Sequence, residues 1–181
     1  MGPESTAQSV FDNARTGHRD GFAGLVRQHQ AMVYSLAWNY LHDQALAEEL
    51  AQEVFLELHR SLASLESAEH VMNWLRRVTV HRCIDQARRD RNRPRLALDD
   101  IAEPAVAAAQ DGDYFLSDRL RKLTASLPEK ARCVLVLRYQ EDMEPTEIAR
   151  TLDMPVNTVK SHLQRSLGML RAKLERMRVS P

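Results

Sequence analysis

Four polar side chains between residues 157 and 164 have the types and the spacing of a surface that reads DNA bases. At 100° per residue they fall on one side of a helix: Asn157, Lys160, Ser161 and Gln164. Asparagine and glutamine can form two hydrogen bonds to adenine, lysine can bond guanine, and serine can donate or accept. Thr158 and Arg165 flank the row and suit phosphate oxygens. The pattern indicates recognition of the major groove.

Two helices joined by a short turn are needed to present this row. Apolar residues with helical spacing occupy the opposite face: Val156, Val159, Leu163, Leu167, Leu170 and Leu174. The preceding helix has an inner face of Ile148, Ala149 and Leu152. The three residues Asp153–Pro155 interrupt the pattern and predict the turn. We therefore expect a helix-turn-helix, and the alternative is the solvated face of an ordinary amphipathic helix.

A second group of side chains suits single-stranded nucleic acid. A stripe about 60° wide on one helix holds an aromatic ring and several cations: Trp74, Arg77, His81 and Arg88. Bases stack on flat rings, and phosphates pair with arginine. The alternative is that Trp74 belongs to the core and the arginines are merely solvated. Further arginines favour phosphate contact: Arg89, Arg91, Arg93 and Arg95.

An exposed leucine is predicted on an acidic helix earlier in the chain. The core face of residues 46–62 is apolar on a helical wheel: Leu46, Ala47, Leu50, Ala51, Val54, Phe55, Leu58 and Leu62. Leu56 falls instead on the polar side, between Glu49 and Gln52 and close to Glu53. An apolar anchor inside a polar rim is typical of a protein interface. A single exposed leucine without any function is the alternative.

Charge is strongly segregated although the formal net charge is zero. Residues 42–57 carry five acids and no Lys or Arg, whereas residues 76–95 carry eight arginines and two aspartates. Residues 96–113 are again acidic, and residues 156–178 hold six Lys or Arg and one Glu. We expect the separate blocks to meet different partners, and the basic ones to attract phosphate.

Several classes of function find no support in the sequence. Cys83 and Cys133 lie far apart without a CxxC pattern, so we expect two small core residues and no zinc or disulfide. The seven histidines show no metal-ligand spacing, and we predict no metal and no cofactor. No nucleophile elbow, phosphate loop or paired-carboxylate setting is recognisable, so we expect a non-enzyme.

Neither membrane insertion nor secretion is expected. No run of about 18 apolar residues occurs, and residues 1–15 lack the plan of a secretory signal. These features predict a cytoplasmic protein.

The periodicity predicts an all-α fold of two small helical domains. Helical spacing runs through residues 22–41, 45–62 and 71–90, and no convincing alternating strand appears. Two further helices are expected at 114–125 and 128–139, with Pro128 in a first helical turn. An acidic linker with two prolines separates the domains. The predicted boundaries are 1–93, 94–114 and 115–181.

The order of these parts resembles the extracytoplasmic-function (ECF, group IV) sigma factors of the sigma-70 family. Four segments carry the resemblance: AEELAQEVFLELHRSL at 47–62, NWLRRVTVHRCIDQARRDRNR at 73–93, SLPEKARCVLVLRY at 126–139 and EIARTLDMPVNTVKSHLQRS at 147–166. The resemblance implies a sigma domain 2 from about residue 22 to 93 and a sigma domain 4 from about residue 115 to 177. It implies no enzymatic activity, and a linker that runs through RNA polymerase.

The resemblance also implies roles for the residues singled out above. The acidic helix would dock on the clamp helices of core RNA polymerase through Glu49, Gln52, Glu53 and Leu56. The loop 64–70 and the following helix would open the minus-ten element through Leu65, Trp74, Arg77, His81, Arg82 and Arg88, with Leu65 and His81 beside an extruded base. The helix-turn-helix would read the minus-thirty-five duplex through Asn157, Thr158, Lys160, Ser161, Gln164 and Arg165. An anti-sigma factor is a further partner implied by the family.

Departures from the family pattern lie in the turn and in both DNA-facing helices. Asp153 and Asn157 stand where glycine is common, and both residue types tolerate left-handed backbone. His162 stands where arginine is frequent, and His81 where a small or amide-bearing residue is frequent. The alternative function is a two-domain helix-turn-helix regulator whose N-terminal domain binds a ligand or dimerises, and which binds duplex DNA without polymerase.

Overall fold

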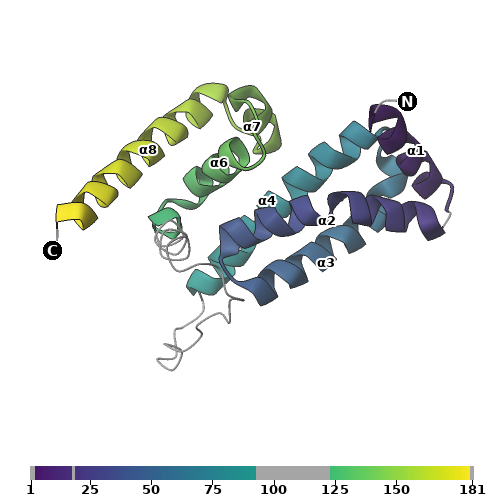
Figure 1. The fold of residues 1–181 in the computed structure, drawn as a ribbon, viewed down its shortest axis with the longest axis horizontal. Helices are drawn as coiled ribbons and strands as arrows, with labels where there is room; N and C mark the ends of the chain where they lie inside the picture. The colour runs from purple at the N-terminus through teal and green to yellow at the C-terminus, as the bar shows by residue number, and fades with distance from the viewer. Residues whose placement is uncertain (1–2, 18, 93–122, 180–181) are drawn as a thin grey trace. The chain divides into compact units, whose positions relative to one another are not determined.

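All regular secondary structure is helical in the residues that the computed structural model describes, which are 3–17, 19–92 and 123–179. The helices in chain order are α1 (Pro3–Arg15), α2 (Arg19–Leu41), α3 (Gln44–Ser61), the 3-10 turn η1 (Leu62–Ser64), α4 (Ala68–Asn92), α6 (Glu129–Tyr139), α7 (Pro145–Thr151) and α8 (Val156–Val179) (Figure 1). No strand occurs in these ranges. The chain divides into two compact units, residues 1–83 and 84–181, and the boundary falls within α4. The predicted all-α fold is confirmed.

The first unit is a small bundle in which α2 packs on α3. Its core includes residues that helical spacing predicted: Leu25, Val33, Leu36 and Ala37 of α2 with Ala47, Leu50, Val54 and Leu58 of α3. Asp43 caps α3, since its carboxylate accepts a hydrogen bond from the Leu46 backbone N–H at 2.9 Å. This cap fixes where α3 begins.

Helix α1 was not predicted from the sequence. Its apolar residues are few, but Phe11 is fully buried and Ala14 nearly so. The helix packs on α2 and lies across the end of the unit where α2 and α4 begin (Figure 1). Two buried residues in a 13-residue helix give too weak a period to separate a docked helix from a polar terminal segment.

Helix α4 begins three residues earlier than the predicted start at Val71. Ser67 precedes it and accepts a hydrogen bond through Oγ from the His70 backbone N–H at 3.1 Å. The buried face of α4 includes Leu75, Val80 and Cys83. The expectation that Cys83 is a small core residue is confirmed.

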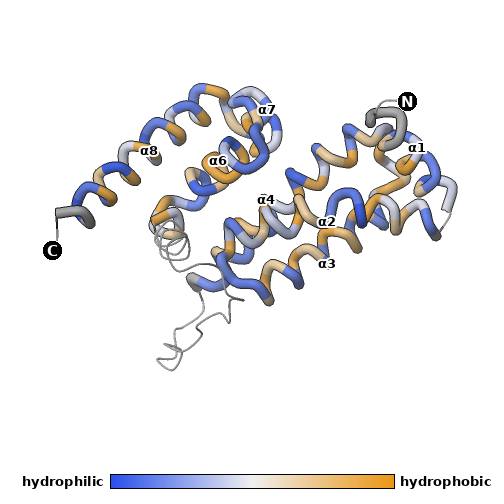
Figure 2. The backbone as a smooth tube through the Cα atoms, viewed as in Figure 1, coloured by the Kyte–Doolittle hydropathy of each residue, from blue (hydrophilic) through white to orange (hydrophobic). Residues whose placement is uncertain are grey.

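The second unit is built around α6, which is apolar on nearly all sides. Much of α6 is hydrophobic in sequence (Figure 2). Residues 133–137 are all buried, so Cys133 is also a core residue. Pro128 occupies the N-cap position and not the first turn, so its expected place was wrong by one residue. The predicted linker, residues 94–114, and most of the predicted helix 114–125 lie outside the described residues; residues 123–125 are helical.

Helices α7 and α8 form the predicted helix-turn-helix. A capping box between Glu144 and Glu147, with Pro145 in the first turn, starts α7. The turn spans four residues, 152–155, one more than expected. Asp153 has a φ of 50°, in the left-handed region that its side chain tolerates. Asn157 lies inside α8 without a positive φ, so the same reasoning does not apply there.

Candidate nucleic-acid and partner interfaces

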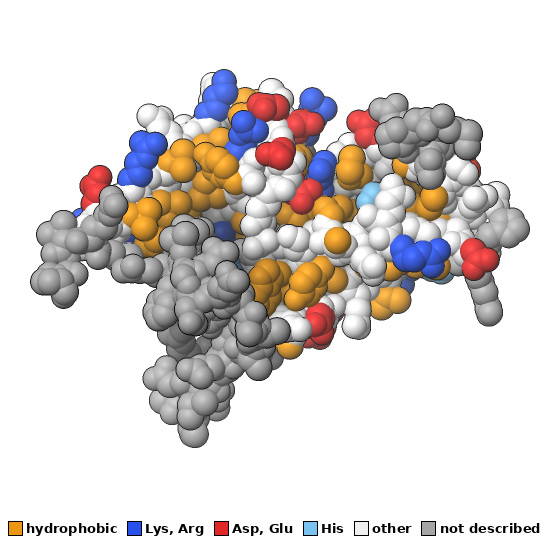
Figure 3. All heavy atoms as spheres, in the orientation of Figure 1, with side chains coloured by type: hydrophobic (Ala, Val, Ile, Leu, Met, Phe, Trp, Pro, Cys, Tyr) orange, Lys and Arg blue, Asp and Glu red, His pale blue; other side chains and the backbone are white. Residues whose placement is uncertain are grey.

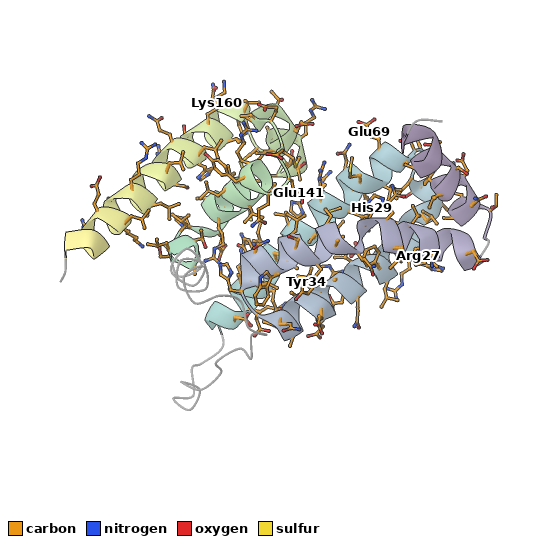
Figure 4. The ribbon with its side chains drawn as sticks, viewed as in Figure 1. Arg27, His29, Tyr34, Glu69, Glu141 and Lys160 are labelled. Carbon is orange, nitrogen blue, oxygen red and sulfur yellow. The ribbon has the colours of Figure 1, made fainter. Side chains whose placement is uncertain are left out.

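The predicted base-reading row lies on the solvent face of α8. Asn157, Thr158, Lys160, Gln164 and Arg165 are exposed, and Ser161 is half-buried. Lys160 projects outward from the helix (Figure 4), and Lys and Arg side chains are spaced along the edge that α8 forms (Figure 3). The arrangement offers amide, hydroxyl and cationic donors in one row.

The opposite face of α8 holds the row in place through its packing. Val159 is fully buried and faces a unit core that includes Ile148, Ala149 and Leu152, as the sequence predicted. Ser166 is also buried, although no prediction placed it there. It follows Val159 by seven residues, about two helical turns, so its position and not its polarity decides its burial. Leu174, near the end of the predicted apolar stripe, is 38% exposed.

His162 lies near two basic side chains, Arg165 of α8 and Lys130. Partial burial lowers its pKa from the ordinary value, and the charges of Arg165 and Lys130 lower it further. The imidazole is therefore neutral near pH 7. Lys130 comes from α6, so this cluster is built by two helices, and no pattern in the sequence joins them.

The cationic stripe of α4 is on the surface as predicted. Arg77, His81 and Arg88 are exposed, and Trp74 is half-buried. Trp74 is thus neither a sealed core residue nor a freely solvated ring, and part of the residue is accessible. Arg88 lies 3.9 Å from Asp85 on the same helix. The side chain of Arg91 and the whole of Arg93 and Arg95 lie outside the described residues.

Arg82 has partners that the sequence did not indicate. Its guanidinium lies 3.2 Å from a carboxylate oxygen of Glu53 and 2.6 Å from one of Glu57. Both glutamates belong to α3, so Arg82 ties the acidic helix to α4. Glu53 was expected on the polymerase surface and Arg82 on the DNA surface, and the structure brings the two together.

Leu65 requires a correction to its predicted place. Its side chain is only 3% exposed, and its N–H donates to the Leu62 carbonyl at 3.2 Å. A side chain that packs in the core cannot border an extruded base in this conformation. We therefore assign Leu65 to the support of the loop and not to contact with DNA.

An open apolar groove runs between α2 and α3. Its volume is about 840 Å³, and aromatic rings from both helices line it, Phe22 and Tyr34 from α2 and Phe55 from α3. Gln52 and Leu56 lie at its edge. Leu56 is 60% exposed, as the helical wheel predicted, and Glu49 and Glu53 are exposed nearby on α3. The sequence located the leucine but not the groove, because the aromatic residues come from separate helices.

The described residues offer neither a membrane span nor a metal site. In these ranges no helix is both long and apolar enough to cross a bilayer. No group of three or more His, Cys, Asp or Glu side chains in the same ranges could hold a metal ion.

Comparison with known proteins identifies both units. Residues 25–93 match the family model for Sigma-70 region 2, and residues 117–170 match that for Sigma-70 region 4. The ECF RNA polymerase sigma factor SigW of Bacillus subtilis is 27% identical, with 94% of this chain and 98% of that protein covered. The ECF RNA polymerase sigma factor SigE of Mycolicibacterium smegmatis is 32% identical, with 93% of this chain and 67% of that protein covered.

A solved structure shares the fold. CnrH, in complex with the cytosolic domain of CnrY, superposes with a TM-score of 0.70 at 19% identity, covering 93% of this chain and 97% of that chain. The two region matches follow the order of the two helical units, and relatives of the same family cover nearly the whole chain. The protein belongs to the sigma-70 family of RNA polymerase sigma factors, in its ECF group.

Proposed function

We propose that this protein is a transcription initiation factor that binds core RNA polymerase, directs it to a subset of promoters and helps to melt the minus-ten element. The observation that carries this function is the pair of region matches, one for each helical unit, in the order of a sigma factor. We assign residues 1–93 to domain 2, 94–114 to a linker and 115–181 to domain 4. The factor recruits and positions the polymerase and makes no covalent chemistry.

Core polymerase docks on the acidic surface of α3. Leu56 supplies an apolar anchor that is already exposed, and Glu49, Gln52 and Glu53 form the polar rim around it. The groove beside Leu56 adds aromatic surface that a partner helix can cover. The acidic rim selects a basic partner surface and speeds the encounter.

The minus-ten element binds across α4. The half-buried Trp74 offers an aromatic ring on which a base can stack, and Arg77, His81 and Arg88 offer contacts to the displaced strand. Extruding a base costs a few kcal/mol, and the stacking and phosphate contacts must offset that cost. Arg82 contributes less to DNA binding than the freely exposed Arg77, because it is already engaged by two glutamates.

The minus-thirty-five element binds α8 as a duplex. Asn157, Lys160, Ser161 and Gln164 read base edges in the major groove, while Thr158 and Arg165 hold phosphates. An α-helix fits this groove, and the packing of Val159 turns the polar row outward.

An anti-sigma factor is a further partner. The groove of α2 and α3 and the stripe of α4 are both open in the free chain, so one inhibitor that covered them would block polymerase and DNA together. A helix-turn-helix regulator that works without polymerase is less well supported, since it leaves the α3 surface and the match to region 2 without a role.

Two substitutions test the division of labour between the DNA surfaces. Trp74→Ala should impair promoter opening more than duplex binding, and Gln164→Ala should do the reverse. Opening is measured by the fluorescence of a base analogue in the minus-ten element, and duplex binding by anisotropy of a minus-thirty-five fragment, both with polymerase holoenzyme. Trp74→Phe, which keeps a ring, and Gln140→Ala, an exposed glutamine outside α8, are the controls. Equal losses in both assays for both variants would refute the assignment.

A further inference from the structure

Helix α1 lies outside the part of the chain that the region 2 model covers, which begins at residue 25. Nevertheless it is firmly docked on the first unit. Phe11 is fully buried, and the Arg15 guanidinium lies 5.6 Å from the centre of its ring. The helix is therefore an integral part of the unit, and the question is what it supports.

The crossing of α1 and α2 is too close for any side chain. A Cβ atom on Gly21 would lie 2.4 Å from the carbonyl carbon of Asn13 and 2.5 Å from the nitrogen of Ala14. One turn further, a Cβ on Gly24 would lie 3.0 Å from Val10 Cγ1. Glycine thus allows backbone-to-backbone contact, and this contact sets the position of α1 on α2.

Gln8 links α1 to the start of α4 through a hydrogen bond. Its Oε1 accepts a hydrogen bond from the Ala68 backbone N–H at 3.2 Å, across sixty residues of sequence. Its Nε2 donates to Asp12 Oδ1 at 3.0 Å, which orients the amide. Ala68 is the first residue of α4, where a helix leaves its N–H groups without partners in the helix itself. One of these groups is satisfied by α1.

The segment that Gln8 holds is the one expected to handle the extruded base. Ser67, beside Ala68, caps α4, and buried Leu65 anchors the loop before it. Trp74 follows Ala68 by six residues, less than two turns of helix. The place of the Trp74 ring relative to the loop therefore depends on where the first turn of α4 sits.

We propose that Gln8 is a positioning residue for minus-ten recognition. The α1 helix braces the loop and the first turn of α4, so that loop and Trp74 meet the displaced strand in one fixed geometry. Gln8 itself touches no DNA. This inference rests on the proposed function, since it assigns α1 a part in promoter opening.

The test compares variants of Gln8 in the full-length protein bound to core polymerase. Gln8→Ala removes one hydrogen-bond acceptor and should lower the rate of promoter opening about fivefold. Affinity for core polymerase and binding to a minus-thirty-five duplex should stay near the wild-type values, and the melting temperature of the free protein should fall by no more than a few degrees. Gln28→Ala, an exposed glutamine on α2, is the matched control and should change none of the four measurements.

A polarity exchange separates positioning from mere loss of packing. In Gln8→Glu with Asp12→Asn, the new carboxylate still accepts from the Ala68 N–H and the new amide donates to it, so opening should recover. The inference is overturned if Gln8→Ala opens promoters as fast as wild type, if the exchange fails to rescue, or if all four measurements fall together. A wild-type protein that cannot open promoters with core polymerase would instead remove the proposed function itself.

Discussion

Shortening Leu56 should weaken the complex with core polymerase without unfolding the protein. Leu56 is 60% exposed, so most of its side chain makes no contact in the free chain and is available to a partner. Complete burial of a leucine contributes about 1.5–3 kcal/mol. The exposed part is then worth about 1–2 kcal/mol on docking, and Leu56→Ala should raise the dissociation constant about 5- to 30-fold.

The assay is equilibrium competition for fluorescently labelled core polymerase at a fixed salt concentration. Leu56→Met is the matched control, because it keeps the volume and the apolar character of the side chain, and it should bind within about twofold of wild type. The melting temperatures of both variants should remain close to that of the wild type, since the mutated side chain is mostly in solvent.

Two results would refute the reasoning about Leu56. If Leu56→Ala bound core polymerase as tightly as the wild type, the leucine would be an ordinary exposed residue. If Leu56→Met lost as much affinity as Leu56→Ala, the effect would not come from apolar burial. Either outcome would move the polymerase contact away from the edge of the α2–α3 groove.

Three further predictions concern charge and backbone. Arg82→Ala should lower the free energy of unfolding by about 0.5–1.5 kcal/mol, since it breaks two partly exposed ion pairs. It should also weaken binding to a pre-melted minus-ten strand less than Arg77→Ala does, and the opposite ranking would contradict the assignment. In the folded protein, burial and the charge of Arg76 lower the pKa of His29 below its ordinary value of 6.5. The unfolded chain therefore binds a proton at a higher pH than the folded protein does. The free energy of unfolding should fall as the pH drops through the ordinary histidine pKa and below it. Melting curves between about pH 7.5 and 5.5 should show this loss, and His29→Gln should reduce it. Asp153→Gly should keep or raise the melting temperature, whereas Asp153→Val should cost about 1–2 kcal/mol, because its φ of 50° is left-handed.

Strong helical periods could be predicted from the sequence alone. The buried faces of α2 and α3 follow from apolar residues at helical spacing, and the same rule places Leu56 in solvent. The helix-turn-helix could equally be predicted from the sequence, because apolar and polar residues of α8 segregate to opposite faces. In each case one helix contains the whole signal.

Features that join distant segments could not be predicted in the same way. Helix α1 has too few apolar residues to reveal a period, and the hydrogen bond that the Ala68 backbone N–H donates to Gln8 forms only in the folded unit. The pairing of Arg82 with Glu53 also depends on how α3 and α4 pack. A helical wheel describes the faces of one helix and does not show how two helices pack together.

The correction at Leu65 has the same physical origin. A leucine in a polar loop is ordinarily expected to be exposed, yet Leu65 is only 3% exposed. Loop side chains take their direction from the surrounding packing, and that information is absent from local sequence. Ser166 shows the reverse case, a polar residue that helical geometry places in the core.

Selection from a random promoter library tests the central claim most directly. Purified protein and core polymerase are mixed with DNA that contains random minus-ten and minus-thirty-five elements, and the open complexes are sequenced. The account predicts enrichment of one motif in each element, with enrichment dependent on both the protein and the polymerase. A palindromic duplex motif, recovered equally well without polymerase, would contradict it.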